Sequence, residues 1–172
     1  MRKTCVFTMA VALLAPMAVL TAGPAGAAGG TTCAKPSGTI TIAPGLTSKP
    51  TVQTITINLP IKACKGGGVT SGVSKGSIKT AAITAATFAG GKPVNLNDTV
   101  TWNTKQTTTF TAASSTKVTK GVITAAVKGK VSKGLFLGAT VTTTVTVKLG
   151  KPGPGGSIKN LTITGTKPFV IT

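Results

Sequence analysis

Side chains that carry most enzyme chemistry are almost absent from this sequence. The 172 residues contain no histidine and no tyrosine, and Asp98 is the only acidic residue. Without an imidazole, neither a Ser-His-Asp triad nor a Cys-His pair can form, and one carboxylate cannot do the work of the pair that glycoside hydrolysis uses. Zinc and calcium sites need several histidine, cysteine or carboxylate ligands. We therefore expect a protein that is not an enzyme and that needs no metal or other cofactor.

One motif with a catalytic counterpart remains. Residues 114–117, Ser-Ser-Thr-Lys, match the S-x-x-K of serine penicillin-binding enzymes, in which the motif opens a helix. The companion S-D-N and K-T-G elements are absent, and the segment is expected to be a turn between strands. We interpret the match as a coincidence.

Long hydrophobic runs are confined to the N-terminus. Residues 1–3, Met-Arg-Lys, carry the positive charge of a signal n-region. Residues 4–20 form an apolar core that small residues follow. The A-x-A match at residues 25–27 predicts cleavage after Ala27, with Ala25 and Ala28 as neighbouring options. An uncleaved anchor is disfavoured, because the run is shorter than the roughly 20 residues of a membrane span. We expect a signal peptide at 1–27, one β domain at 28–172, and no transmembrane anchor after cleavage.

Cysteine is scarce, and the scarcity leaves one pairing. Cys5 leaves with the signal peptide, so Cys33 and Cys64 remain as an even pair in an exported and oxidising setting. A disulfide that closes a loop of about 30 residues contributes roughly 3 to 4 kcal/mol in the chain-entropy model. Lipid modification of Cys33 is the alternative, but residues 30–32 are not the apolar context it requires. The sequence predicts a Cys33–Cys64 disulfide.

Negative charge is nearly missing, and positive charge is almost all lysine. The formal net charge is +18, of which Arg2 and Lys3 leave with the signal peptide. Such a surface attracts polyanions, with an affinity that falls as salt screens it. The alternative is that the lysines only solubilise polar strand faces and protect edges. The possible polyanion contacts that we single out are Lys128, Lys130 and Lys148.

Specific recognition of nucleic acid is not expected. After cleavage the chain has no arginine, the residue that reads guanine edges and holds phosphates in a bidentate manner. Most of its few aromatic residues are predicted to point inward, so we expect no platforms on which bases could stack. Trp102, the only tryptophan, shares a strand face with Val100 and is predicted to lie in the core.

Alternation of apolar and hydroxyl side chains dominates the rest of the chain and indicates β-strands. The predicted strands cover residues 39–42, 54–59, 74–80, 99–103, 106–112, 121–131, 140–149, 158–164 and 168–171. Segments 99–103 and 106–112 are predicted to form a hairpin. Residues 81–89 are compatible with a short helix or another strand. The pattern predicts an all-β fold: an antiparallel β-sandwich (Ig-like) or a partly open barrel of about 8 to 9 strands, after an N-terminal signal helix.

Residues 33–72 also carry a resemblance. Their segments APGLTSKPTVQTITIN and CKGGGVTSG are similar to those of small secreted actinobacterial proteins of unknown function, which share a cysteine, a PGLT…PTVQTIT segment and a C-x-GGGVTSG turn. The resemblance extends more loosely through the Trp102 strand to the C-terminal GTKPFVIT. It implies export and a β-rich fold, and it transfers no activity. Members of this group often carry further cysteines, which this chain lacks at residues 82–87.

Export and positive charge together suggest a function. We expect a non-enzymatic, secreted or cell-envelope-associated protein whose lysines adhere to anionic wall or membrane polymers. The alternative is a secreted effector or antimicrobial-type protein that acts on anionic membranes, although the amphipathic helix that such proteins often use is missing. The oligomeric state and the identity of a partner are not predicted.

Overall fold

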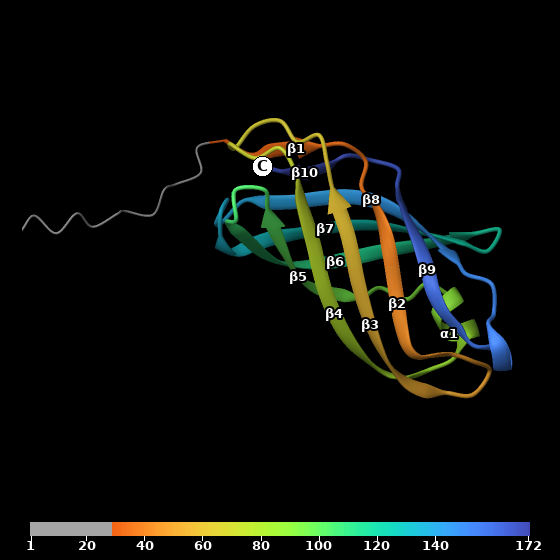
Figure 1. Ribbon diagram of the computed structural model, residues 1–172. Coiled ribbons are helices and arrows are strands. Elements are labelled where there is room, and N and C mark those ends of the chain that lie inside the picture. Colours follow the sequence, from red (N-terminus) through yellow and green to blue (C-terminus); the bar gives the residue numbers. More distant parts are fainter. Residues whose placement is uncertain (1–28) are drawn as a thin grey trace, which may run out of the picture.

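The computed structural model describes residues 29–172, so the predicted signal peptide at 1–27 and the helix expected within it lie outside the described residues (Figure 1). The strands are β1 (Thr31–Cys33), β2 (Ser37–Leu46), β3 (Thr51–Ile61), β4 (Gly72–Ile83), β5 (Asn95–Trp102), β6 (Thr107–Thr119), β7 (Val122–Gly134), β8 (Thr140–Leu149), β9 (Ile158–Gly165) and β10 (Phe169–Ile171). A short helix, α1 (Ala85–Ala89), follows β4, and a single 3-10 turn, η1 (Pro154–Gly156), precedes β9.

The eight strands β2 to β9 form a closed antiparallel barrel. Each strand pairs with the next one along the chain, and β9 pairs with β8 on one side and with β2 on the other. The order is therefore an up-and-down meander, which is the simplest way to close a sheet on itself. In Figure 1, β2, β3, β4 and β9 lie on the near side of the barrel and β5, β6 and β7 cross behind them.

The all-β, antiparallel prediction is confirmed, and so is the barrel of about eight strands that was the alternative to a sandwich. The Ig-like sandwich is wrong, and the barrel is closed and not partly open. The sheet closes through the pairing of β9 with β8, from Val145↔Gly165 to Leu149↔Leu161. A sandwich and a barrel both place apolar residues inward and polar residues outward along each strand. Strand periodicity therefore could not separate them, because the difference lies in which distant strand edges meet.

The remaining two strands extend the barrel at one end. β10 continues along the edge of β8 that β9 occupies further on, with Val170 opposite Thr142, and β1 pairs with β10. Both interruptions contain a proline, Pro36 between β1 and β2 and Pro168 between β9 and β10. Proline has no N–H to donate to a sheet, so the ladder breaks at these two places.

Inward-facing side chains form two separate clusters of the core. One cluster gathers the aromatic residues Trp102, Phe110, Phe136 and Phe169 around the disulfide. The other is aliphatic, rich in isoleucine, and fills the opposite part of the barrel. The predicted core position of Trp102 is confirmed, since only 2% of its surface is exposed. The predicted hairpin is also confirmed, with β5 and β6 paired from Asn95↔Ala113 to Thr101↔Thr107.

The ambiguous segment 81–89 contains both predicted elements. β4 continues to Ile83, and α1 begins at Ala85 after Thr84, whose side chain accepts a hydrogen bond from the N–H of Thr87. A threonine N-cap satisfies one of the amide groups that a helix start leaves unpaired. The helix ends at Gly90, and the chain then crosses to β5.

Candidate functional site

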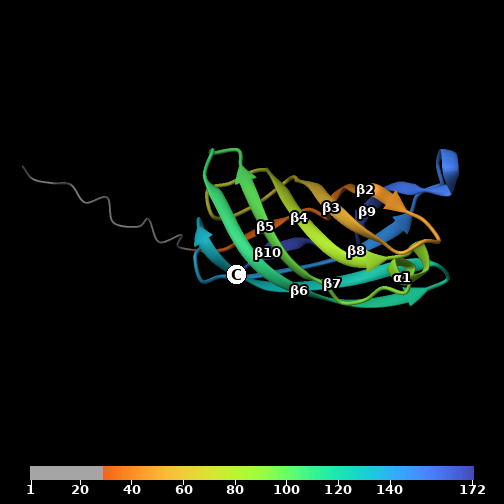
Figure 2. The same cartoon turned by 90° about the horizontal axis from the view of Figure 1, so that it is seen from below.

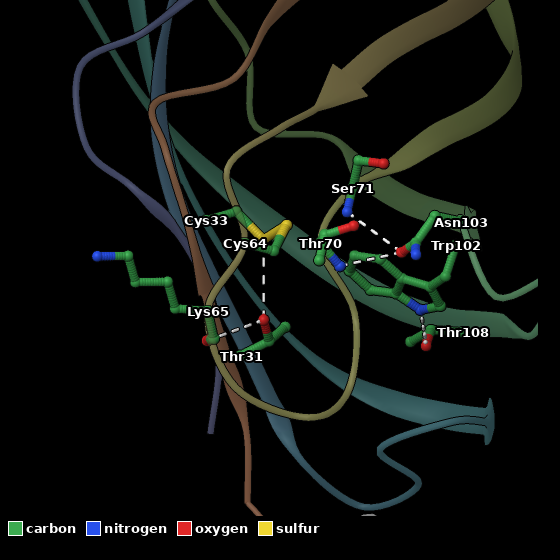
Figure 3. Close-up of a disulfide and its surroundings, with 9 residues drawn as sticks. All are labelled: Thr31, Cys33, Cys64, Lys65, Thr70, Ser71, Trp102, Asn103 and Thr108. Carbon is green, nitrogen blue, oxygen red and sulfur yellow. Dashed lines mark hydrogen bonds between the residues drawn. A yellow bond between two sulfur atoms is a disulfide. The ribbon is translucent and has the colours of Figure 1, made fainter.

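One end of the barrel is closed by the disulfide and its surroundings. Cys33 of β1 is bonded to Cys64 of the β3–β4 loop, as predicted (Figure 3). Backbone hydrogen bonds between Thr32 and Lys65 run in both directions, at 3.0 and 2.9 Å, and hold the loop against β1. The Asn103 side chain accepts from the N–H groups of Thr70 and Ser71 and fixes the far end of the same loop.

Aromatic side chains fill the barrel behind this loop. The indole N–H of Trp102 donates to the Thr108 hydroxyl at 2.8 Å, and that hydroxyl donates to the carbonyl of Leu135 at 2.8 Å. Trp102 and Phe136 meet edge to face with ring centroids 5.9 Å apart. Every polar group in this chain of contacts has a partner, so this end is a packed core.

The opposite end of the barrel contains an apolar cavity of about 460 Å³. Cavities that bind small molecules measure about 300 to 1,000 Å³ and are lined mainly by hydrophobic side chains. The aliphatic lining residues are Ile40, Ile55, Ile57, Ile78, Ile83, Leu96, Ile123, Val127, Val145, Val147 and Ile163. They come from seven different strands, so the cavity lies in the interior of the barrel.

The cavity lies where two neighbouring strands separate. β4 and β5 pair only between Gly72↔Trp102 and Gly76↔Asp98. Beyond Gly76 the two strands diverge, and α1 with the following segment 90–94 spans the gap between them. Thr87 and Phe88 of α1 and Gly91 to Val94 line the cavity from this side. Figures 1 and 2 show α1 at the end of the molecule opposite the C-terminus.

Contacts with β6 hold this covering segment in place. The Thr116 hydroxyl donates to the carbonyl of Gly91, and the Ser114 hydroxyl donates to the carbonyl of Val94 at 3.2 Å. The Ser114 oxygen also accepts from the N–H of Val94 at 3.0 Å. The described part of the chain exposes four large hydrophobic residues. Three of them lie at this end of the barrel: Val52, Val94 and Val118. The outer surface around the cavity therefore carries three exposed valines beside its lysines.

The residues singled out for polyanion contact are all exposed, but they are not one cluster. Lys128 and Lys130 are neighbours on the outer face of β7, opposite Thr142 and Thr140 of β8. Lys148 lies opposite Val122 at the other end of β7, about 20 Å from Lys128 at about 3.3 Å per residue. Only Lys128 and Lys130 can contact one short anionic segment together.

Asp98 lies inside the barrel, and its burial was not predicted from the sequence. On the inward face of β5, Asp98 lies between Leu96, which lines the cavity, and Val100, which belongs with Trp102 to the aromatic cluster. Ser74 donates to its Oδ2 at 3.0 Å, while Oδ1 is buried without a hydrogen-bond partner among the described residues. Burial raises the pKa of this carboxyl above its usual 3.8, and the Ser74 hydrogen bond offsets part of that effect.

The S-x-x-K residues do not come together. Residues 114–117 lie within β6 and not in the predicted turn, so that expectation is corrected. Ser114 is buried and bonded to Val94, whereas Lys117 is exposed on the other face of the strand. Successive side chains of a strand alternate between faces, and an odd spacing separates the pair.

The cavity is the candidate site that the sequence did not predict. The small size of some inward side chains is the one feature of the sequence that could have indicated a cavity. On β7, three consecutive inward positions are Ala125, Val127 and Gly129. Such small residues leave space unless a large residue faces them from across the barrel. Which residue faces which depends on closure, and closure was not predicted.

The fold and the cavity together define a closed antiparallel barrel, packed at one end and hollow at the other. The chain matches no protein-family model, no curated protein and no solved structure. No helix within residues 29–172 has the length and hydrophobicity needed to cross a membrane.

Proposed function

We propose that this protein binds a small apolar molecule, or the apolar part of a larger one, inside the α1 end of its barrel. The observation that carries the proposal is the cavity of about 460 Å³ with its almost wholly aliphatic lining. Eight-stranded barrels have an interior that side chains can fill or that can hold one small ligand. Here the aromatic end is filled, and the aliphatic end is not.

A matched pair of substitutions on β7 tests this proposal. Ala125 lines the cavity and Ala126 is exposed, so Ala125→Phe places a ring in the cavity and Ala126→Phe places the same ring in solvent. The probe is N-phenyl-1-naphthylamine, a neutral dye whose fluorescence rises in apolar surroundings. We expect the wild-type protein and Ala126→Phe to bind the dye with the same affinity, and Ala125→Phe to bind it at least about tenfold more weakly.

Two results would contradict the proposal: no binding to the wild-type protein, or equal binding to both variants. Val127→Phe, at the next inward position of β7, provides a second blocked cavity if Ala125→Phe does not fold. Circular dichroism and thermal unfolding of each variant establish that it is folded before binding is measured.

Adhesion to anionic polymers of a cell envelope is a second candidate function, as the charge of the sequence predicts. It is supported by the exposure of every lysine within residues 29–172 and by the burial of the only acidic side chain. The outer face therefore carries positive side-chain charge alone. Attraction of this kind weakens as salt shortens the Debye length from about 30 Å at 0.01 M to about 8 Å at 0.15 M.

Co-sedimentation with isolated cell envelopes across a salt series tests adhesion. We expect binding at low salt that fades smoothly, and a Lys128→Gln/Lys130→Gln variant that binds more weakly than a Lys62→Gln/Lys65→Gln variant of equal charge. Equal binding by the two variants would mean that net charge alone acts, and no sedimentation at low salt would reject adhesion. Release of dye from anionic vesicles would instead favour the membrane-acting alternative.

A further inference from the structure

The cavity has one charged lining residue, and it is a cation. Lys92 lies in segment 90–94 between α1 and β5, and it is the only ionisable side chain that contributes to the lining. Its side chain is exposed, so the ammonium group can reach solvent at the edge of the cavity while the segment that carries it covers the cavity. An apolar cavity with one cation at its edge suits an amphiphile, whose apolar chain would occupy the cavity and whose head group would lie near the cation.

Among the other polar lining groups, the hydroxyls are already used within the protein, and the exposed amide of Asn95 carries no charge. The hydroxyls of Ser114 and Thr116 are bonded to the backbone of segment 90–94. Thr80 accepts from the N–H of Gln53, and the Thr87 hydroxyl is 3.0 Å from that of Thr84. These groups hold the walls together, which leaves Lys92 as the strongest remaining donor for a ligand.

No acidic side chain competes for Lys92. The one carboxylate side chain of the chain, Asp98, is 5% exposed and accepts a hydrogen bond from Ser74 inside the barrel. Further lysines stand at the loops and strand ends of this end of the barrel: Lys49, Lys117, Lys120, Lys148 and Lys151. The local potential around the cavity is therefore positive and favours an anionic head group over a neutral or cationic one.

We propose that the ligand is a single-chain amphiphile with an anionic head, of the long-chain carboxylate or alkyl sulfate type. Its alkyl chain occupies the aliphatic cavity, and its head group binds the Lys92 ammonium at the edge. This inference rests on the proposed function, because it requires the cavity to hold an apolar chain. It adds the chemical class of the ligand and the residue that selects it.

Displacement of N-phenyl-1-naphthylamine by three ligands of equal chain length tests the inference: hexadecanoate, hexadecanol and hexadecyltrimethylammonium. We expect hexadecanoate to displace the dye at the lowest concentration. In Lys92→Gln its affinity should fall about two- to fivefold, the range of one exposed charge pair, while that of hexadecanol stays the same. Lys151→Gln, which removes an equal charge from a residue outside the lining, is the matched control and should have a smaller effect. All titrations are done below the concentration at which each amphiphile forms micelles.

The outcomes separate the inference from the function beneath it. If the neutral dye does not bind the wild-type protein, the proposed function fails and this inference fails with it. If the dye binds but hexadecanoate and hexadecanol displace it equally, the cavity binds apolar molecules and the inference about charge is wrong. Equal losses in Lys92→Gln and Lys151→Gln would assign the selectivity to the overall positive field and overturn the role of Lys92.

Discussion

Asp98 is a carboxyl residue buried in the barrel interior, although a carboxylate is most stable in water. Its carboxyl is buried next to Gly76, and a Cβ built on Gly76 would overlap Oδ1. Glycine at this position therefore leaves the space that the carboxyl occupies. Phe110 is the paired residue on the other neighbouring strand, β6. No cation faces the carboxyl from these paired positions, so the neutral form is favoured.

The raised pKa of Asp98 makes stability depend on pH. Folded protein keeps the proton to a higher pH than unfolded protein, whose carboxyl titrates near 3.8. Unfolding then releases the proton, so stability falls as pH rises from about 4 through the folded pKa and levels off above it. Between about pH 4.5 and 7 no other side chain titrates, because the chain has no histidine and no glutamate.

Replacement of Asp98 by Asn should remove this dependence. The amide keeps an oxygen for the Ser74 hydroxyl but carries no charge, so we expect Asp98→Asn to unfold at the same temperature across that pH range and to be more stable than wild type at pH 7. Thermal unfolding followed by circular dichroism in a series of buffers measures both. The exposed neighbour Asn97→Asp provides the control, since a solvated carboxylate should leave the wild-type slope in place. A wild-type unfolding temperature that does not fall over this range would refute the account.

Gln53 is a second buried polar residue that the alternating pattern concealed. Its side-chain oxygen accepts from the N–H of Gly45 at 3.0 Å, and its amide donates to the carbonyl of Gly45 at 3.1 Å and to the hydroxyl of Thr51. These bonds tie the end of β2 to the start of β3 beside the cavity. The predicted strand 54–59 begins just after Gln53, and β3 extends the same alternation back to it, so that Gln53 shares the inward face of Ile55.

We expect Gln53→Ala to destabilise the protein by about 1 to 3 kcal/mol, because the backbone groups of Gly45 lose their buried partners. Gln106→Ala is the matched control: Gln106 is exposed in the β5–β6 turn, and its replacement should cost less than about 0.5 kcal/mol. Urea unfolding of the two variants gives both values. If both variants lose the same free energy of unfolding, the hydrogen bonds between Gln53 and Gly45 contribute no more to stability than an exposed glutamine does.

At the scale of elements, the two ends of the barrel are stabilised by different means. The disulfide joins residues separated by 31 positions and secures β1 and the β3–β4 loop over the aromatic cluster. The other end depends on α1 and on the bonds of segment 90–94 to β6. A disturbance at one end should therefore leave the other largely intact.

Loss of the disulfide tests this separation. We expect Cys33→Ser/Cys64→Ser to lower the free energy of unfolding by about 2 to 5 kcal/mol while leaving dye binding unchanged wherever the variant is folded. Dithiothreitol added to the wild-type protein should lower the unfolding temperature in the same direction and should not affect the variant. Simultaneous loss of dye binding in folded variant protein would show that the two ends are coupled.

At the scale of the whole molecule, positive charge opposes folding. Every lysine of the described chain is exposed, and no acidic side chain accompanies them at the surface. Repulsion within a compact state destabilises it, and salt screens that repulsion. We expect the unfolding temperature to rise between about 0.01 M and 0.15 M NaCl, and to rise less in a variant with four lysines replaced by glutamine. Calorimetry measures both slopes, and an unfolding temperature independent of salt would contradict the expectation.

The sequence by itself determined all the strands except β1, the inward direction of their side chains, the position of Trp102 and the pairing of Cys33 with Cys64. These properties are local, or follow from a single available choice, because alternation repeats every two residues and only two cysteines remain after the predicted cleavage. Closure of the sheet, the separation of β4 from β5, the cavity and the burial of Asp98 were decided only by the tertiary structure. Each depends on which strand edges meet across the barrel, and such long-range pairings leave no mark in the period of any one strand.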